Sequence, residues 1–344
     1  MGLFSKLAVR ATTVAGSCGN KPSKSLSVRK ERACHIETLF VNHKGEVFPC
    51  CMTWGRPEMR IGHIEDKDLL EAIKDFYSPC SCEGFCLRAG SPGEGLNIDL
   101  INIELSLACQ GQCALCGVKA PDWKGHYDYY QSLEKVIERL KPKRLLVQGG
   151  EVLIQKKSME WLRSLEKKYP GLRIELVTNG NVDMDRVGEI EALFTSVSIS
   201  MMAFEPATYE RVMGMDFEKT LKFAEQLARG KAYLILKYLV TPVSIHEANL
   251  FLAWAIKLHP GKILFDDAST ARYLVRDTGD RFWDKISERT GVKIKEVLTC
   301  HKRSLLDGTT EVLFAKRSLK SLGLESDLGD FLVRNELRKK VRTF

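Results

Sequence analysis

The sequence predicts an α/β protein: a partial (β/α)6 TIM-like barrel preceded by a small cysteine-rich module. From residue 102 onward, short apolar segments of strand type alternate with amphipathic helical segments. This alternation is typical of a parallel sheet with right-handed crossovers. Only six strand segments fit, whereas a closed eight-stranded barrel needs about 250 residues. Six cysteines also crowd into residues 34–86, ahead of the first of these strands.

The expected strands are short and strongly apolar, and they cover residues 102–107, 144–148, 173–178, 196–201, 233–240 and 262–265. Helices are expected between them because apolar residues recur there at i, i+3, i+4 and i+7. Two of these helices are carried by Leu133, Val136, Ile137 and Leu140, and by Phe251, Trp254, Ala255 and Leu258.

The chain divides into four parts by composition. Residues 1–30 are rich in Ser, Lys and Gly and predict a flexible tail. Residues 31–96 predict the cysteine-rich module, in which two strands flank an Asn42–Gly45 turn and a helix follows near Asp68–Asp75. The barrel is expected over residues 97–300, and residues 301–344 predict a basic helical extension.

Composition narrows the class of protein. With 44% hydrophobic and 28% charged residues among 344, and no apolar run long enough to span a bilayer, a soluble chain without a membrane partner is expected. Eleven cysteines without a secretion signal indicate a reducing compartment and metal binding, so the expected location is cytoplasmic. The net charge of +8 is spread along the chain, so a nucleic-acid partner is not expected.

A cysteine triplet follows the first barrel strand in the pattern C-x3-C-x2-C: Cys109, Cys113 and Cys116. So tight a spacing can place three thiolates around one compact inorganic centre. A [4Fe–4S] cluster held by three cysteines keeps one iron open to a small molecule. The alternative is a structural zinc site completed by His126, since four Cys and His ligands close a zinc tetrahedron.

This triplet after a first strand resembles the radical S-adenosylmethionine (radical SAM) superfamily. The second strand ends in Gly149, Gly150 and Glu151, which is similar to the superfamily motif near the methionine amino group of S-adenosylmethionine (SAM). Thr178 and Asn179 end the third strand in a sequence that is also frequent in the superfamily. Ser198 and Ser200 share one face of the fourth strand and are expected to contact the ribose. The superfamily often has Ser-x-Asp here, whereas this chain has Met202 in place of the Asp.

The resemblance implies the chemistry. A reduced [4Fe–4S] cluster cleaves SAM to methionine and a 5′-deoxyadenosyl radical, which abstracts a hydrogen atom from a substrate C–H bond. A reducing electron donor such as flavodoxin or ferredoxin is implied as a partner. The expected substrate is a peptide or protein, and a sugar or other small metabolite is the alternative. A further alternative is a non-enzymatic binding protein that holds zinc or an iron–sulfur cluster.

The earlier cysteines resemble the SPASM/Twitch auxiliary iron–sulfur module of radical SAM enzymes. Cys34 and Cys50 frame the hairpin as C-x10-G-x4-C, and a C-x-C-x3-C group follows the helix. The resemblance implies a second [4Fe–4S] cluster, although the module normally follows the barrel. Cys51 is either another ligand or buried, and a zinc-ribbon-like staple is the alternative for the set. The expected ligands are Cys34, Cys50, Cys80, Cys82 and Cys86.

Four further residues are candidates for catalysis or for contact with the substrate. Cys300 stands alone after the last barrel strand. It is either a small core residue, a distant ligand of the auxiliary cluster, or the hydrogen-atom donor of a radical SAM epimerase. Lys237 on the fifth strand and Asp266–Asp267 after the sixth are candidate substrate contacts.

Overall fold

The computed structural model describes residues 38–53, 57–76, 97–113, 116, 128–240, 244, 247–267, 312–314 and 341–343. Among them, Cys50, Cys51, Cys109, Cys113 and Cys116 are in no disulfide bond. The other predicted ligands and the candidate donor lie outside the described residues: Cys34, Cys80, Cys82, Cys86 and Cys300. His126 and the tail at residues 1–30 lie outside them as well.

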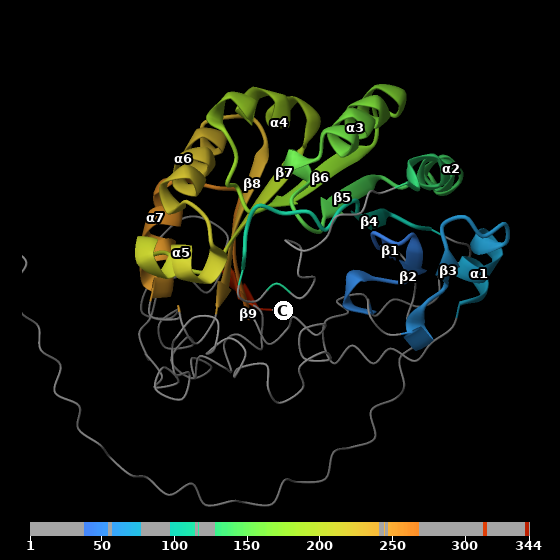
Figure 1. The fold of residues 1–344 in the computed structure, drawn as a ribbon, viewed down its shortest axis with the longest axis horizontal. Helices are drawn as coiled ribbons and strands as arrows, with labels where there is room; N and C mark the ends of the chain where they lie inside the picture. Colours follow the sequence, from blue (N-terminus) through green and yellow to red (C-terminus); the bar gives the residue numbers. More distant parts are fainter. Residues whose placement is uncertain are drawn as a thin grey trace, which may run out of the picture.

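Six parallel strands in chain order form the barrel portion of the sheet (Figure 1). Each predicted strand is present, and the sheet stays open, which confirms the predicted partial barrel. The first strand ends at Glu104, three residues earlier than expected, and Leu105–Leu107 continue as buried chain without strand pairing. The six strands are β4 (Leu100–Glu104), β5 (Arg144–Gln148), β6 (Arg173–Thr178), β7 (Ser196–Met201), β8 (Tyr233–Val240) and β9 (Lys262–Asp267).

Helices cover the convex face of this sheet (Figure 1). Alternate strand residues such as Val147, Leu176 and Ile199 are fully buried and belong to the same hydrophobic core as the apolar helix residues. Burying this face is the main source of stability for such a layered fold. The helices are α2 (Tyr130–Leu140), α3 (Lys156–Lys168), α4 (Val187–Leu193), α5 (Pro206–Met213), α6 (Phe217–Ala228) and α7 (Ala248–Lys257).

The other face of the sheet, here called the concave face, carries the residues that alternate with the core positions. Ser196, Ser198 and Ser200 are half-buried there, while their neighbours Val197 and Ile199 are fully buried on the helix side. The alternation follows the two-residue period of a strand. The serines therefore share one face, as the sequence predicts.

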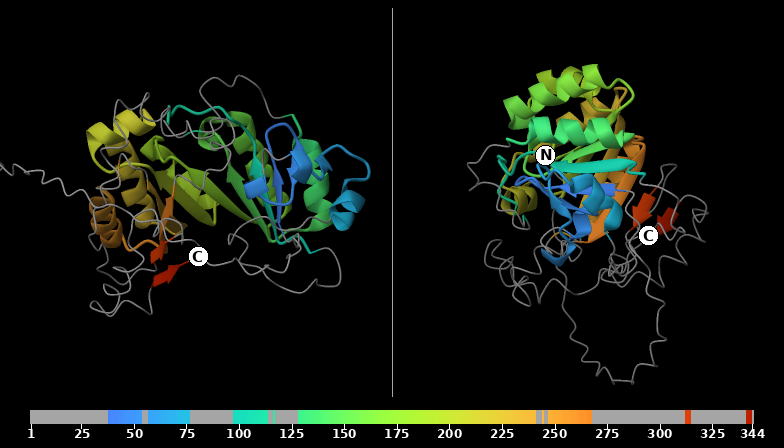
Figure 2. Two further views of the ribbon diagram at one scale, coloured as in Figure 1. Left: turned by 90° about the horizontal axis from the view of Figure 1, so that it is seen from below. Right: turned by 90° about the vertical axis from the view of Figure 1, so that its right-hand side faces the viewer.

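The N-terminal segment extends the same sheet. Strand β1 (Thr38–Val41) pairs in parallel with β4, and β2 (Glu46–Phe48) and β3 (Gly62–His63) add antiparallel strands beyond it. Both views of Figure 2 show these blue strands beside the barrel. Short 3-10 helices η1 (Cys51–Thr53) and η2 (Pro57–Met59) follow β2, and α1 (Leu69–Asp75) follows β3. The predicted hairpin and helix are both present.

The opposite edge of the sheet carries two further parallel strands, β10 (Val312–Phe314) and β11 (Val341–Thr343). These are the only described stretches beyond residue 301, and they are strands where the sequence predicts a helical extension. Both contain a β-branched valine; β10 pairs with the edge of β9, and β11 pairs in turn with β10. Within the described part of the chain, no helix is long and apolar enough to cross a membrane.

Candidate functional site

The carboxyl ends of β4, β5 and β6 meet at one edge of the sheet, and the predicted cofactor residues gather there. Cys109 lies five residues beyond the end of β4, Gly149 and Gly150 follow β5 directly, and Asn179 follows β6. In parallel α/β barrels this edge is where catalytic groups collect.

The Cys109 sulfur accepts two hydrogen bonds from the surrounding chain. The backbone N–H of Gly111 lies 3.3 Å from Sγ, and the side-chain amide Nδ2 of Asn179 lies 3.5 Å from it. Burial raises the pKa of the Cys109 thiol to about 11, and these two donors oppose the rise. Donors of this kind stabilise a sulfur that carries negative charge, as it does when bound to a metal.

Asn179 is fixed in place by its neighbours. Its Oδ1 accepts hydrogen bonds from Asn181 N–H at 2.8 Å and from Gln110 Nε2 at 3.2 Å. The Asn181 side chain in turn donates to the carbonyl of Asp216 at 2.6 Å. The amide that faces the Cys109 sulfur is therefore preorganised. The sequence did not identify Gln110 or Asn181 as site residues. The only signals were that Gln110 follows Cys109 and that Asn181 follows the Asn179–Gly180 turn.

The Gly149–Gly150 turn lies directly against the cysteine loop. Both glycines have positive φ, +85° and +51°. A Cβ on Gly150 would lie 2.5 Å from the Ala108 carbonyl oxygen, and one on Gly149 would lie 2.2 Å from Glu104 Cγ. The backbone N–H of Glu151 donates to the Ala108 carbonyl at 2.8 Å. The glycines thus allow β5 to support the loop that carries Cys109.

Alanine at Gly150 is expected to destabilise the fold by about 2–4 kcal/mol, because it adds backbone strain and a clash with the cysteine loop. Urea unfolding of the iron-free protein measures the loss. Gly188→Ala is the matched control, since no atom lies within 4 Å of its added Cβ. It lies inside α4, so alanine there should stabilise by roughly 0.5–1 kcal/mol. Equal effects of the two substitutions would contradict the packing argument.

Glu151 is fully buried, and both of its carboxylate oxygens accept hydrogen bonds from the protein. Oε2 accepts from Thr178 Oγ1 at 2.8 Å and from Asn179 N–H at 2.9 Å, and Oε1 accepts from Leu153 N–H at 3.2 Å. Burial raises its pKa, while these hydrogen bonds and the charge of Arg186 oppose the rise. Its carboxylate therefore joins the ends of β5 and β6.

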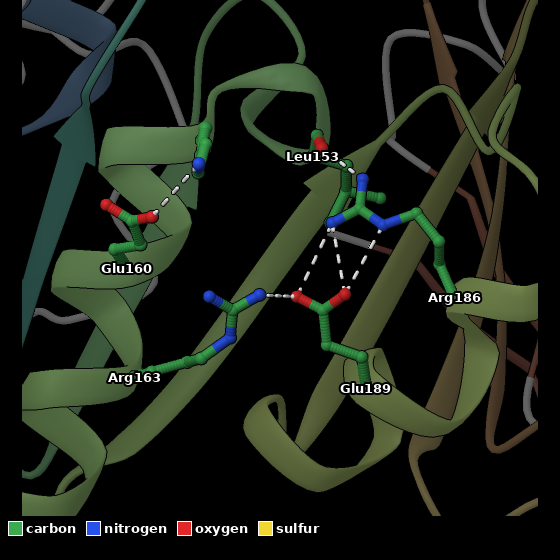
Figure 3. A network of polar contacts seen from close by, with 6 residues as sticks. Leu153, Glu160, Arg163, Arg186 and Glu189 are labelled. Carbon is green, nitrogen blue, oxygen red and sulfur yellow. Dashed lines mark hydrogen bonds and ion pairs between the residues drawn. The ribbon is translucent and has the colours of Figure 1, made fainter.

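An ion-pair network on the outer side holds the Glu151 turn against the next helix (Figure 3). Arg186 donates to the Leu153 carbonyl and pairs with Glu189 at 3.3 Å. Arg163 on α3 pairs with the same Glu189. The 3-10 helix η4 (Val152–Ile154) is thereby tied to α3 and α4.

A buried pair joins the N-terminal segment to the edge of the barrel. His43 Nδ1 lies 2.7 Å from Glu104 Oε2, which also accepts from the His43 backbone N–H at 3.2 Å. The side chains are only 11% and 6% exposed. Glu104 in turn packs against Gly149. No sequence pattern identified this pair, although a glutamate within a mostly apolar strand is a signal that could have found it.

His43→Ala is expected to destabilise the protein by about 1–3 kcal/mol, since the buried Glu104 carboxylate loses the imidazole and keeps only the backbone N–H of residue 43. The measurement is the free energy of unfolding in urea. The exposed pair of Lys74 and Glu71 gives the control, because such surface pairs contribute roughly 0–1 kcal/mol. A His43→Ala protein as stable as Lys74→Ala would show that the pair does not anchor the segment.

Of the remaining predicted residues, Thr178 lies at the Glu151 turn, and the others lie on the concave face or at the end of β9. Thr178 donates to Glu151 and accepts from Gly180 N–H at 3.0 Å, so its hydroxyl contacts the turn. Ser200 is the register partner of Lys237, and both lie half-buried on the concave face. Asp266 and Asp267 are the last residues of β9.

The chemistry of the donor set fits an iron–sulfur cluster. Cys109, Cys113 and Cys116 lie in one loop at the edge formed by the carboxyl ends of the strands. The Cys109 sulfur already accepts the hydrogen bonds that a bound thiolate needs. Among the described residues, no three Cys, His, Asp or Glu side chains are grouped closely enough to hold a single metal ion.

Two family models match the chain. Residues 103–238 match the Radical SAM superfamily, and residues 34–80 match SPASM, an iron–sulfur cluster-binding domain. No curated protein matches.

Solved structures give weaker likenesses. Streptococcus suis SuiB bound to the precursor peptide SuiA is 13% identical with a TM-score of 0.49, covering 72% of this chain and 48% of SuiB. Native anSMEcpe with bound AdoMet and Cp18Cys peptide is 21% identical with a TM-score of 0.42, covering 49% and 50%. The chain spans about half the length of these structures. TM-scores below 0.5 are too low for an inference about function.

The two family matches coincide with the two parts of the described sheet. The first covers the strands from the end of β4 into β8 together with the cysteine loop, and the second covers β1, β2, β3 and α1. Residues 103–238 therefore match a radical SAM domain, which implies a [4Fe–4S] cluster and SAM as cofactors, and residues 34–80 match a SPASM domain, which implies an auxiliary iron–sulfur cluster.

Proposed function

We propose that this protein is a radical SAM enzyme that modifies a peptide or protein. The observation that carries the proposal is the Cys109 sulfur, held at the carboxyl edge of the sheet by the Gly111 N–H and the Asn179 amide. A [4Fe–4S] cluster held by Cys109, Cys113 and Cys116 would supply the one-electron reductive cleavage of SAM, and with it the radical chemistry needed to take a hydrogen atom from a substrate C–H bond.

The chain's own residues have three tasks in this proposal. Cys109, Cys113 and Cys116 hold the cluster and leave one iron open to SAM. Gly149 and Gly150 let the chain beyond β5 approach the cysteine loop, and Glu151 fixes that chain to Thr178 and Asn179. Ser198 and Ser200 offer hydroxyls on the concave face, where a ribose would need hydrogen-bond partners.

The N-terminal module supports the choice of substrate. Its match to SPASM implies an auxiliary cluster, and radical SAM enzymes with such a module often act on peptides. We propose residues 31–96 as this module, 97–300 as the catalytic barrel and 301–344 as an extension. The proposed ligands of the second cluster are Cys34, Cys50, Cys80, Cys82 and Cys86. We also propose that the module is of the SPASM/Twitch-like type. A flavodoxin or ferredoxin in the cytoplasm is the proposed electron donor.

The test is SAM cleavage by the anaerobically reconstituted protein. With dithionite as the reductant, the protein should release 5′-deoxyadenosine and methionine in equal amounts. The result that would refute the proposal is iron-loaded protein that releases no 5′-deoxyadenosine, or a colourless zinc-loaded protein. The role of Cys300 as hydrogen-atom donor stays a prediction. If Cys300→Ala incorporated as much deuterium from the solvent into the product as the unmodified protein does, that role would be refuted.

A further inference from the structure

A cavity of about 240 Å³, here called the module pocket, lies in the N-terminal module. It has room for about eight water molecules, since each takes about 30 Å³ in the liquid. Pockets for whole small molecules are larger, roughly 300–1,000 Å³, so this one suits a single side chain. The residues that line it are Asn42, His43, Lys44, Glu46, Phe48, Pro57 and Arg60.

The module pocket lies on the concave side of the sheet. Phe48 lines the pocket and pairs in register with Phe40 of β1, which pairs in turn with Asn102 of β4. Register partners point to the same side of a sheet. Asn102 alternates along β4 with Ile101 and Ile103, which belong to the main core under the helices. The pocket therefore shares its side of the sheet with the concave face of the barrel.

A series of contacts connects the module pocket to the Gly149 turn. His43 lines the pocket, and its Nδ1 lies 2.7 Å from Glu104 Oε2. Glu104 Cγ lies 2.2 Å from the position that a Cβ on Gly149 would take, and Gly149 directly follows β5. The pocket therefore lies next to the carboxyl edge of the sheet, where the cysteine loop lies.

The lining of the module pocket carries an excess of positive charge. Lys44 and Arg60 are cations, and Glu46 is the one carboxylate among the lining residues. Both oxygens of Glu46 already have partners, because Oε2 accepts from Asn42 Nδ2 at 2.8 Å and Oε1 lies 3.4 Å from Arg60. Within the described part of the chain, Lys44 forms no ion pair. One positive charge is therefore left without a counterion, which favours an anionic ligand.

Both cations start from segments that hydrogen bonds hold in place. The Lys44 N–H donates to Asn42 Oδ1 at 3.0 Å, and the Lys44 carbonyl accepts from His63 Nε2 at 2.8 Å. Asn42 is itself only 3% exposed. Arg60 is held separately, since its Nε donates to the Gly62 carbonyl at 3.4 Å. The ammonium and the guanidinium therefore reach the pocket from two anchored points of the module.

A carboxylate matches this lining. It brings one negative charge and two acceptor oxygens, which an ammonium and a guanidinium can bind together. We propose that the module pocket binds a carboxylate of the peptide substrate, carried by an acidic side chain or by the C-terminus. Lys44 supplies the charge, and Arg60 supplies N–H groups that its contacts with Glu46 and Gly62 do not use. This inference rests on the proposed function for its substrate class.

The experiment compares three capped amino acids as probes of the anaerobically reconstituted protein. N-acetyl-glutamate α-methylamide carries a side-chain carboxylate, N-acetyl-alanine carries a terminal one, and N-acetyl-glutamine α-methylamide is a neutral probe. Saturation-transfer NMR titrations at low ionic strength measure the dissociation constant of each. At least one acidic probe should bind roughly three- to tenfold more tightly than the neutral probe, and the tighter one identifies the source of the carboxylate. Equal binding of all three, or no binding of any, would overturn the inference.

Substitutions of Lys44 assign the binding to the module pocket. Lys44→Met keeps an unbranched side chain without the charge, and it should weaken the tighter acidic probe roughly three- to tenfold. Lys44→Arg keeps the charge and should bind that probe like the unmodified protein. Lys74→Met is the matched control, because it removes the same charge from the exposed face of α1 and should leave binding unchanged. Equal affinities of Lys44→Met and Lys74→Met would contradict the assignment.

SAM cleavage by the unmodified protein of the same preparation is a separate readout. Selective binding of an acidic probe without release of 5′-deoxyadenosine would refute the proposed function and leave the carboxylate site standing. Release of 5′-deoxyadenosine together with equal binding of the three probes would refute the carboxylate site alone.

Discussion

Replacing Cys109 with alanine is expected to reduce 5′-deoxyadenosine formation to the level of a protein-free control. Three thiolates are the whole protein contribution to a cluster with an open iron, so the loss of one leaves two irons without protein ligands. The variant should also lose the iron that belongs to this cluster. The measurement is 5′-deoxyadenosine by chromatography, together with iron per chain, after identical anaerobic reconstitution.

Two companion variants make the Cys109 result specific. Lys74→Ala, on the exposed face of α1, should keep full activity. Asn179→Ala removes a donor to the sulfur but keeps all three thiols, and it should lower activity or cluster affinity by about 10–100-fold. Substantial SAM cleavage by Cys109→Ala would contradict the assignment of this loop as the cluster site.

Glu151→Ala is expected to destabilise the iron-free protein by about 3–5 kcal/mol. The substitution removes the acceptor of three hydrogen bonds, from Thr178, Asn179 and Leu153, and leaves those donors buried. Glu151→Gln should cost less, about 1–3 kcal/mol, because its one remaining oxygen can still accept from Thr178 and Asn179. Urea unfolding without SAM or iron measures both values.

The stability of both variants in the absence of SAM shows whether Glu151 has a structural role. If Glu151 served only to bind SAM, both variants would unfold like the unmodified protein in the absence of SAM. Equal stability of Glu151→Ala and the unmodified protein would therefore contradict the structural role that its hydrogen bonds indicate.

The six barrel strands were predictable because each is a short apolar run between amphipathic helices. Alternation of Ser and apolar residues in β7 also predicted correctly which residues share the concave face. The end of β4 was not predictable in this way, since Leu105 and Leu107 are as buried as strand residues although the chain leaves the sheet at Glu104. Burial alone does not distinguish a strand from the buried loop that follows it.

The site was predictable in its motifs but not in its contacts. The Gly149–Glu151 motif was expected near SAM, and in the structure the Cβ positions of its glycines face Glu104 and the cysteine loop. Glu151 was expected near an ammonium group of SAM, and its oxygens accept from the protein itself. The His43–Glu104 pair joins residues 61 positions apart. Such a pairing depends on β1 lying beside β4, which no local pattern indicates.

The central claim is that Cys109, Cys113 and Cys116 hold a [4Fe–4S] cluster with one iron open to SAM. The most direct measurement is Mössbauer spectroscopy of ⁵⁷Fe-reconstituted protein during titration with SAM. We predict that a single iron of one cluster changes its isomer shift as SAM binds, and that Cys109→Ala lacks this change. Spectra in which no iron responds to SAM would contradict the account.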